Sequence, residues 1–349
     1  MSSVEDRNWG EVEKSIKKQI SRLAFGSLEM TSYRIFYKVI RDSILDERLL
    51  EKIKQLKDTR KAVILAHNYQ PAEIQDLADF TGDSLGLSIK AAETDADVIV
   101  FCGVQFMAET AAILSPDKVV LLPDKFAGCP LADMINAEQL RQLKQKHPDA
   151  LVVCYVNSSA EVKAESDYCC TSANAVELVS SLPEDKPIIF VPDQHLGQFV
   201  IEKTGRELVL WPGYCHVHVV ITEEDVKNAK KKYPDAIVMA HPECTEPVKE
   251  LSDQILSTGQ MLKFVKTSTA KRYIVATEIG IIHALKKQNP QAEFIAASDK
   301  AVCPNMKKIS LDKVIGSLQD MQYEVKLPEE ITVKAKKALD RMVEILPAR

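Results

Sequence analysis

The sequence lacks several features that would assign a function at once. No apolar run is long enough to span a bilayer, and acidic side chains stand where a secretory signal would have its apolar core. A GxGxxG segment after a strand pattern and a GxxxxGKS/T motif are both missing, so neither a dinucleotide nor a nucleoside triphosphate site is indicated. The net charge of −5 leaves no basic excess for nucleic acid. We therefore expect a cytoplasmic protein that binds neither membranes nor nucleic acid.

CxxC pairs of cysteines are missing as well. The chain has eight cysteines, but none of them forms the CxxC pair of a usual structural zinc site. In a cytoplasmic protein we expect reduced thiols, some of them metal ligands, rather than a disulfide framework. Cys102 and Cys154 lie inside apolar strand patterns and fit small core residues. The pattern leaves Cys169, Cys170 and Cys244 undecided.

An internal repeat accounts for the other three cysteines. Each copy begins with an apolar strand pattern that ends in polar residues: VILAHNY at 63–69, LVVCYVN at 151–157 and AIVMAHPE at 236–243. Counted from His67, Tyr155 and His241, an aspartate follows after 12 residues, a hydroxyl after 17 and a cysteine after 60 to 62. The aspartates are Asp79, Asp167 and Asp253, the hydroxyl residues are Ser84, Ser172 and Thr258, and the cysteines are Cys129, Cys215 and Cys303. Such equal offsets indicate three copies of one structural unit.

The repeat also predicts the fold class. Each copy has the order strand, short helix, loop, longer helix, strand, helix, strand and cysteine loop. This alternation is typical of an α/β protein, here with three homologous three-layer α/β/α domains and parallel sheets. We expect the domains to be arranged around a pseudo-threefold axis. The expected boundaries are a helical extension at 1–55, repeats at 56–140, 141–227 and 228–312, and a C-terminal strand and helix at 313–349.

A threefold arrangement would bring the three repeat cysteines to one point. Ligands of parallel α/β folds bind at the carboxyl ends of the strands, where the repeat landmarks lie. Three thiolates leave two alternatives open: a zinc site completed by His216 or His218, or an iron-sulfur cluster with one open iron. The polar residues expected around this point indicate a substrate cavity and favour a reactive metal. They are His67, Tyr69, Tyr155, Asn157, His218, His241 and Glu243.

The repeated hydroxyl residues stand where helices are expected to begin. Each of them can act as a helix N-cap, which is a structural role. A helix N-terminus also offers free N–H groups and a favourable dipole, so three such ends could instead hold a small anion with several carboxylates or a phosphate. The repeated aspartates precede the loops, and we expect them to brace these loops rather than to react.

Taken together, these motifs resemble those of the quinolinate synthases, iron-sulfur enzymes of NAD biosynthesis. The resemblance runs from about residue 64 to the C-terminus and includes AHNYQ, GDSL, YVNSS, TSANA, GYCHVH, HPEC, STGQM and VCPNMKK. It implies a 4Fe-4S cluster held by Cys129, Cys215 and Cys303. It also implies condensation of iminoaspartate with dihydroxyacetone phosphate to quinolinate, phosphate and water. An aspartate oxidase or dehydrogenase that makes iminoaspartate and the iron-sulfur assembly machinery are the functional partners that it implies.

The resemblance further suggests roles for single residues. Glu243 is the expected main proton-moving carboxylate, Tyr69 and Tyr155 are acid or orienting groups, and His241 completes the catalytic set. The expected substrate-binding residues are His67, Ser84, Asn157, Ser172, His218 and Thr258. An open iron would act as a Lewis acid that assists loss of water.

Two features depart from the family pattern, and two other functions stay open. Residues 1–45 have no recognised counterpart in compact members of the family. In the second cysteine loop, His216 stands where proline is expected and adds an imidazole. One alternative function is an aconitase-like hydro-lyase that acts on another polycarboxylate. The other is a non-catalytic protein whose three repeats are tied by a structural zinc and bind a small anion.

Overall fold

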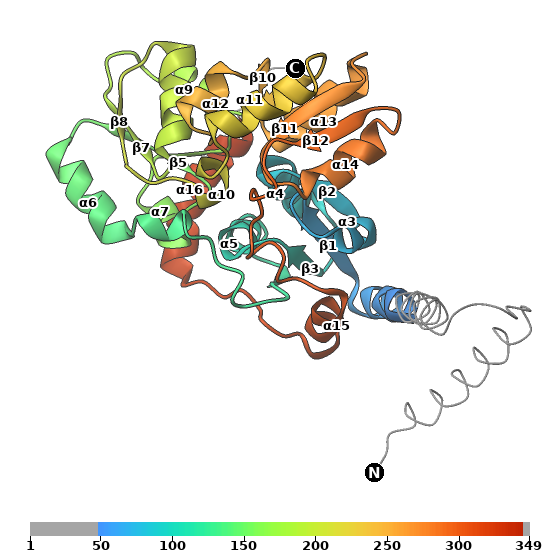
Figure 1. Ribbon diagram of the computed structural model, residues 1–349. Helices are drawn as coiled ribbons and strands as arrows, with labels where there is room; N and C mark the ends of the chain where they lie inside the picture. The colour runs from blue at the N-terminus through green and yellow to red at the C-terminus, as the bar shows by residue number, and fades with distance from the viewer. Residues whose placement is uncertain (1–47, 345–349) are drawn as a thin grey trace, which may run out of the picture. The chain divides into compact units, whose positions relative to one another are not determined.

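The computed structural model describes residues 48–344, and the residues from Lys52 onward form one compact unit (Figure 1). Residues 48–60 are helical, as the sequence pattern predicts. The helical extension predicted for residues 1–47 and the end of the C-terminal segment, 345–349, lie outside the described residues. No described helix has the length and apolar character that crossing a membrane requires.

Three four-stranded sheets form the framework, and every strand pairing in them is parallel. The predicted α/β class with three parallel sheets is therefore confirmed. Each sheet has the same strand order, with the first strand of the repeat between the second and the third and the fourth at the far edge. In that order the strands are β2 (Phe80–Gly82), β1 (Ala62–His67), β3 (Val98–Cys102) and β4 (Val119–Leu121); β6 (Tyr168–Cys170), β5 (Leu151–Tyr155), β7 (Ile188–Val191) and β8 (Leu208–Leu210); and β10 (Gln254–Ile255), β9 (Ile237–Ala240), β11 (Arg272–Ala276) and β12 (Glu293–Ala296).

One helix follows each of the first three strands of every repeat. These helices are α3 (Ala72–Leu77), α4 (Ser84–Glu93) and α5 (Gln105–Leu114); α7 (Ala160–Ala164), α8 (Ala175–Ser181) and α9 (Gln194–Thr204); and α12 (Glu246–Glu250), α13 (Thr258–Thr267) and α14 (Ile281–Gln288). The other elements connect or close the repeats. They are the 3-10 helix η1 (Ala132–Met134) and the helices α6 (Ala137–Lys146), α10 (His216–Val219), α11 (Glu223–Lys232), α15 (Leu311–Asp320) and α16 (Glu329–Glu344).

The sequence pattern missed one strand in each repeat. The predicted order has a loop between the first two helices, whereas the structure has the edge strands β2, β6 and β10 there. These strands contain three, three and two residues. So few residues cannot display the alternating pattern by which strands are recognised in a sequence. The other three strands of each repeat lie where they were expected.

The repeated aspartates tie the first and second strands of each repeat together. A carboxylate oxygen of Asp79 accepts a hydrogen bond from the backbone N–H of Ile64 at 2.8 Å. Asp167 and Asp253 make the same contact, also at 2.8 Å, with the equivalent N–H of their own first strand. The structural role that the sequence predicts for these aspartates is confirmed, but the backbone that they brace is that of the first strand rather than of a loop.

The C-terminal segment packs against the first and second repeats. The guanidinium group of Arg60 donates hydrogen bonds to two carbonyl oxygens at the end of α15. Helix α16 packs against α5, α7 and β6, and Arg341 in this helix donates to the carbonyl oxygen of Asp167. The strand predicted before α16 is reduced to a single antiparallel bridge between Leu121 and Glu324.

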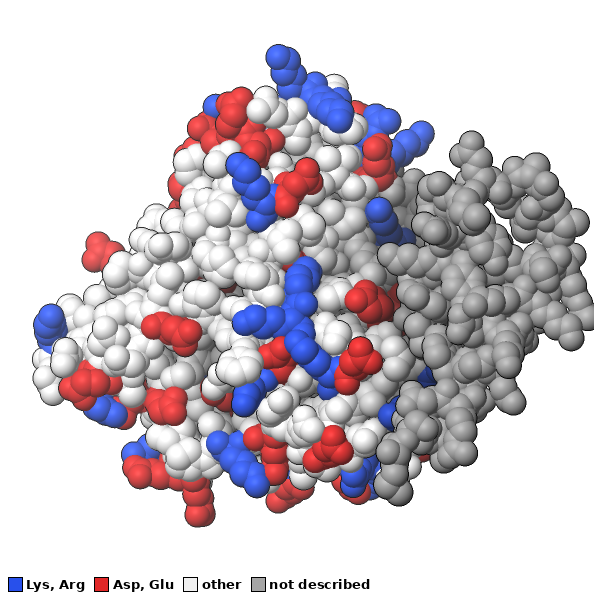
Figure 2. All heavy atoms as spheres, turned by 60° about the horizontal axis from the view of Figure 1, so that its bottom comes forward, with Lys and Arg blue, Asp and Glu red and all other residues white. Residues whose placement is uncertain are grey.

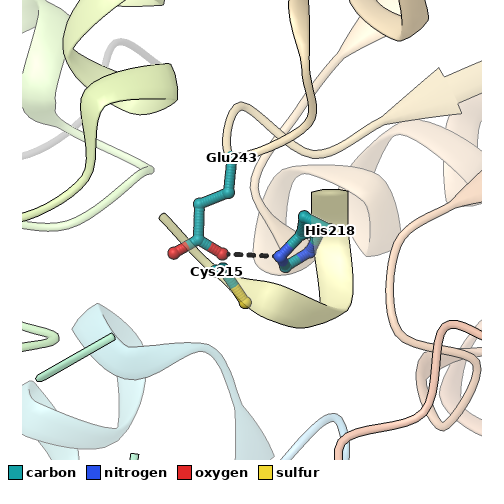
Figure 3. A group of neighbouring side chains, drawn as sticks. All are labelled: Cys215, His218 and Glu243. Atoms are coloured by element: carbon teal, nitrogen blue, oxygen red, sulfur yellow. Dashed lines mark ion pairs between the residues drawn. The ribbon is translucent and has the colours of Figure 1, made fainter. Parts of the chain in front are cut away.

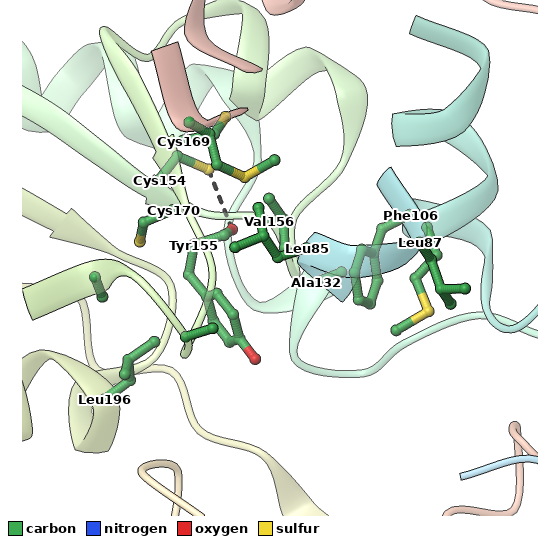
Figure 4. Packing of buried hydrophobic residues seen from close by; sticks show 14 of the residues in the cluster. Leu85, Leu87, Phe106, Ala132, Cys154, Tyr155, Val156, Cys169, Cys170 and Leu196 are labelled. Atoms are coloured by element: carbon green, nitrogen blue, oxygen red, sulfur yellow. Dashed lines mark hydrogen bonds between the residues drawn. The ribbon is translucent and has the colours of Figure 1, made fainter. Parts of the chain in front are cut away.

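The apolar core runs through the sheets, because helices cover both faces of a parallel sheet. Strands β3 and β7 are buried at every residue. Figure 4 shows part of this core, where Cys154 and Cys169 lie among packed side chains while Tyr155 points the opposite way from its strand. Cys102 and Cys154 are fully buried core residues, as predicted, and the three undecided cysteines are fully buried too.

Charged side chains are dispersed over the outer surface. Figure 2 shows Lys and Arg interspersed with Asp and Glu on the face that it presents. Some of the described charges pair, as Arg272 does with Asp235 at 3.2 Å and with Glu293 at 2.8 Å. Exposed pairs contribute only about 0–1 kcal/mol each, so they affect solubility more than they stabilise the fold.

Candidate functional site

One cavity collects the residues that the sequence singles out for chemistry. Its space, counted together with the open solvent at its mouth, is about 720 Å³, and its wall includes side chains from all three repeats. The predicted residues that line it are His67, Tyr69, Ser84, Cys129, Tyr155, Asn157, Ser172, Cys215, His218, His241, Glu243, Thr258 and Cys303. They follow the carboxyl ends of the strands, which is where parallel α/β folds place their ligands.

Three thiols, here called the cavity cysteines, are Cys129, Cys215 and Cys303. Each of them follows the last strand of a different sheet. Backbone N–H groups of residues just after each cysteine lower the pKa of its thiol. They belong to Leu131 and Ala132 for the first, to His218 for the second, and to Asn305 and Met306 for the third. Such N–H groups favour the thiolate form.

Burial opposes the thiolate form of all three cavity cysteines. It is the main cause that raises the pKa of Cys129 to about 12, and it also raises the pKa of Cys215 and Cys303. Neighbouring thiolate charges and the carboxylate of Glu243 raise the pKa of Cys129 and Cys215 further. A bound metal cation would offset this penalty, because metal-bound thiols are deprotonated. The donor set therefore fits a cationic metal group.

The carboxylate of Glu243 is 3% exposed and lies among polar partners. Its Oε2 is 2.8 Å from His218 Nδ1 (Figure 3), and its Oε1 accepts a hydrogen bond from Asn157 Nδ2 at 3.3 Å. The contact with Nδ1 is not aligned as a straight hydrogen bond, so it is mainly electrostatic. Burial alone would raise the pKa of Glu243, but His218, with the Tyr155 hydroxyl, outweighs burial and lowers the pKa to about 2. The carboxylate is therefore ionised at neutral pH.

His67 and His241 occupy equivalent strand ends and share one hydrogen-bond pattern. Nδ1 of each ring accepts the backbone N–H two residues later, from Tyr69 at 3.2 Å and from Glu243 at 3.3 Å. Burial is the main cause that lowers the pKa of both histidines to about 3. Both rings are thus neutral, with the proton on Nε2. In His241 this Nε2–H lies 3.2 Å from Ser172 Oγ and can donate to it, so the approach of His241 Nδ1 to the Glu243 carboxylate is not an ion pair.

The repeated hydroxyl residues do not cap their helices. Asp83 is the N-cap of α4 and Ser257 is the N-cap of α13. Ser84 and Thr258 are therefore the first helical residues, and Ser172 lies in the loop before α8. The interpretation of these hydroxyls as N-caps is wrong, because the neighbouring residue takes that role in two copies. Their side chains line the cavity instead.

Two contacts join strand ends of one repeat to hydroxyls of another. Asn68 Nδ2, from the first repeat, donates to Thr258 Oγ1 of the third at 3.0 Å. His241 of the third repeat contacts Ser172 of the second. The strand end of the first repeat thus contacts a hydroxyl of the third, and the strand end of the third contacts a hydroxyl of the second. A threefold arrangement would require this order of contacts. The pseudo-threefold axis itself stays a prediction.

Sequence reasoning gave no role to Glu278, which also lines the cavity. Its buried carboxylate accepts the backbone N–H of Cys303 at 3.1 Å and that of Gly280 at 2.7 Å. Lys307 Nζ pairs with it at 2.9 Å. Glu278 thus holds the third cysteine loop in place. The signals for it in the sequence are its position just after an apolar strand pattern and the acidic Asp193 at the equivalent position of the second repeat. The added imidazole of His216 lines the same cavity.

A second donor set overlaps with the cavity cysteines. Ligand atoms of Cys215, His218 and Glu243 lie within 4.8 Å of one another (Figure 3). A thiolate, an imidazole and a carboxylate are all common zinc ligands. This set keeps open the alternative of a zinc site that includes His218. It leaves Cys129 and Cys303 without a role.

Comparison with known proteins identifies the family. A sequence model of the family described as quinolinate synthetase A protein matches residues 51–344. The quinolinate synthase of Dehalococcoides mccartyi is 57% identical over 300 residues, which are 86% of this chain and 99% of that protein. Quinolinate synthase 2 of Methanosarcina acetivorans is 53% identical over 303 residues, 86% of this chain and 97% of that protein. The quinolinate synthase of Geotalea uraniireducens is 52% identical over 299 residues, 86% of this chain and 98% of that protein.

The matched region contains all three sheets and every residue of the cavity wall. Residues 1–50 lie outside the family match, in agreement with the departure noted in the sequence. The family resemblance of the motifs is confirmed. This chain belongs to the quinolinate synthase family and is an enzyme of NAD biosynthesis.

Proposed function

We propose that the chain condenses iminoaspartate with dihydroxyacetone phosphate to form quinolinate, phosphate and water. One observation carries the proposal: a cysteine from each repeat lines the same cavity as the ionised carboxylate of Glu243. A condensation with loss of water needs groups that move protons and a site for anionic substrates, and this cavity offers both. Membership of the quinolinate synthase family supports the same reaction.

The proposed cofactor is a 4Fe-4S cluster held by the three cavity cysteines. The backbone N–H groups that lower the pKa of each of these thiols are consistent with thiolate ligands. Three protein ligands would leave one iron open, and that iron would supply a Lewis acid for a substrate oxygen. Glu278 would help to hold the third of these ligands, Cys303, in place, because its carboxylate accepts the backbone N–H of that residue.

Glu243 is the proposed proton-moving carboxylate. It begins as a carboxylate and is held between Asn157 and His218. A group with a pKa of about 2 is a weak base. Entry of an anionic substrate would raise this pKa, because a nearby like charge disfavours the ionised form. Binding of the substrate would thus move Glu243 toward the range in which a general base is effective.

Tyr69 and Tyr155 are proposed as groups that orient the substrate and exchange protons with it. Burial is the main cause that raises the pKa of both tyrosines, so both remain phenols at neutral pH. A phenol can donate a hydrogen bond to a substrate oxygen or accept one from a substrate hydroxyl. His241 would act beside them, and Asn157 would anchor the substrate and Glu243.

The proposed anion sites are the hydroxyl residues Ser84, Ser172 and Thr258, with His67 and His218 beside them. Ser84 and Thr258 are the first residues of the ten-residue helices α4 and α13. Free backbone N–H groups at these helix starts favour a carboxylate or phosphate. Because neighbouring residues cap these two helices, the hydroxyls of Ser84 and Thr258 remain available for such a ligand.

The setting follows from the reaction. We place the enzyme in the cytoplasm, with iminoaspartate supplied by an aspartate oxidase or dehydrogenase and the cluster supplied by iron-sulfur assembly machinery. We propose no nucleic-acid or membrane partner. The three repeats at 56–140, 141–227 and 228–312 are proposed as domains around a pseudo-threefold axis.

Metal analysis and a product assay of the anaerobically purified protein test this function. About four irons per chain, with broad visible absorption, are expected for the cluster. The same sample should form quinolinate from the two named substrates. One zinc without iron would favour the set of Cys215, His218 and Glu243 and would overturn the cluster. An iron-loaded protein that forms no quinolinate would favour a hydro-lyase with another substrate.

A further inference from the structure

The first helix of each repeat carries one long polar side chain that is buried. Counted from the same strand ends as the other repeat landmarks, it follows after 8 residues in all three copies. These residues, here called the buried donors, are Gln75 on α3, Lys163 on α7 and Lys249 on α12, and they are 4%, 0% and 3% exposed. A buried polar group is costly unless it has a hydrogen-bond partner, so the partners of these three side chains show what the position is for.

Each buried donor reaches a backbone carbonyl oxygen of another repeat. The strand registers place the three carbonyls at one equivalent position, four residues after the end of β3, β7 or β11. The first repeat donates to the third, the second to the first and the third to the second. The contacts are Gln75 Nε2 to the carbonyl oxygen of Gly280 at 2.9 Å, Lys163 Nζ to that of Phe106 at 3.4 Å, and Lys249 Nζ to that of His195 at 3.2 Å.

The segment that each buried donor holds is also paired with a cysteine loop. The N–H group one residue before the contacted carbonyl donates to the carbonyl oxygen of the residue that stands two before the cavity cysteine. In the second repeat the two segments pack so closely that a Cβ on Gly213 would collide with the carbonyl oxygen of Pro192. A shift of the held segment would therefore displace the cysteine loop with it. The pairs are Gln105 with Ala127 at 2.8 Å, Gln194 with Gly213 at 2.9 Å, and Ile279 with Ala301 at 3.0 Å.

We propose that the buried donors are positioning residues, each of which keeps the cavity cysteine of a neighbouring repeat in place as a metal ligand. The ligand role of the cysteines rests on the proposed function, whereas the support of each loop rests on the contacts themselves. Without its donor a cysteine loop opens more often, because opening then no longer costs this hydrogen bond. The assigned pairs are Lys249 with Cys215, Lys163 with Cys129 and Gln75 with Cys303.

Lys249 gives the cleanest test of this support. Gln75 and Lys163 also donate to a carbonyl oxygen in the strand-end loop of their own repeat. Lys249 pairs otherwise with the carboxylate of Glu246, whose side chain is 42% exposed, so water can replace the lysine there. Lys249→Met therefore removes the donor with little disturbance of its own repeat.

Thiol labelling of the full-length chain after removal of iron measures how often each cysteine loop opens. In Lys249→Met we expect Cys215 to react with a maleimide about tenfold faster than in wild type, with the other two cavity cysteines within about twofold. Lys249→Gln supplies the side chain that the first repeat uses at this position and should return the Cys215 rate to within about threefold of wild type. Lys118→Met is the matched control, because Lys118 donates to the carbonyl oxygen of Ala96 in its own repeat, and it should change none of the three rates.

The pattern of labelling separates positioning from general stability. A role in stability alone would raise the rates of all three cavity cysteines together, and a local role would raise that of Cys303 in the repeat of Lys249. Either pattern would overturn the inference, as would a wild-type rate at Cys215. If Lys249→Met does not fold, Lys163→Met takes its place and Cys129 is the thiol expected to react faster. Equal rates at the three thiols of that variant would also overturn it.

Iron release gives a second measurement. Anaerobically loaded Lys249→Met should lose iron to a chelator about tenfold faster than wild type, and Lys118→Met should lose it at the wild-type rate. Release from Lys249→Met at the wild-type rate would contradict the positioning role. A wild-type chain that binds no iron or forms no quinolinate would overturn the proposed function alone, because the labelling pattern would still decide whether neighbouring repeats support the cysteine loops.

Discussion

Replacing Glu243 with glutamine removes one negative charge from the cavity and leaves its shape nearly unchanged. The glutamine retains an oxygen that can accept the hydrogen bond from Asn157 Nδ2, which is 3.3 Å from Oε1 of the glutamate. The charge that faces His218 Nδ1 at 2.8 Å is lost. The substitution therefore separates the proton-moving role of Glu243 from its role in packing.

We expect kcat to fall by about a hundredfold or more, the scale for loss of a general acid or base. This corresponds to about 3 kcal/mol or more in activation free energy. The affinity for quinolinate should stay within about threefold or increase, because removing the carboxylate relieves repulsion of a dicarboxylate. Iron content should not fall, since the charge of Glu243 is one of the causes that raise the pKa of Cys129 and Cys215.

Anaerobic steady-state kinetics, a quinolinate titration and iron analysis measure these three quantities. Glu246→Gln is the matched control, because Glu246 lies on α12 outside the cavity wall and its side chain is 42% exposed. The control should keep wild-type kcat. A Glu243→Gln variant with kcat within about threefold of wild type would remove Glu243 from the mechanism. Loss of iron in that variant would show that the carboxylate supports the metal site instead.

Three further predictions follow from the same cavity. Serine at any one of the cavity cysteines should abolish both iron binding and activity, whereas Cys102→Ser should retain both; iron analysis after anaerobic reconstitution checks this. Ser172→Ala should weaken quinolinate binding by about 1.5–3 kcal/mol with the visible spectrum unchanged, and a loss of melting temperature with intact affinity would make the hydroxyl structural. His67 and His241 have a pKa of about 3 in the folded protein against about 6.5 unfolded, so the unfolded chain binds more protons between these values and stability should fall as pH falls below about 6.5. From pH 7 to about 5.5 each should cost about 1 kcal/mol of unfolding free energy, and a denaturant series in which His67→Gln keeps the full slope would contradict this.

The equal offsets of the repeat made most of the site predictable. They placed the cavity cysteines after equivalent strands and indicated a structural role for the repeated aspartates. A residue that recurs at one offset in three copies occupies the same place in the same fold. The ends of the longer strands could be predicted from apolar runs such as the one that ends at His67. The short strands β2, β6 and β10 could not be predicted, because their pairing with the first strand rather than their own composition determines them.

A residue that occurs in one copy could not be found by comparing copies. Thr277 follows β11, and neither of the other repeats has a hydroxyl at the equivalent position. Its hydrogen-bond partner Tyr69 comes from the first repeat, so only the folded arrangement brings the two together. Glu278 does have an acidic counterpart, the buried Asp193 of the second repeat, but its pairing with Lys307 has no local signal in the sequence.

The supply of one thiol by each sheet has a consequence for the integrity of the enzyme. A group held by all three sulfurs is retained only while every sheet keeps its last strand and the loop after it. Iron would then stay bound only while all three sheets are folded. Loss of iron would show that the least stable of the three had unfolded. Repair of a damaged chain would accordingly have to restore all three cysteine loops before metal could be reloaded, since a single repeat supplies only one of the three thiols.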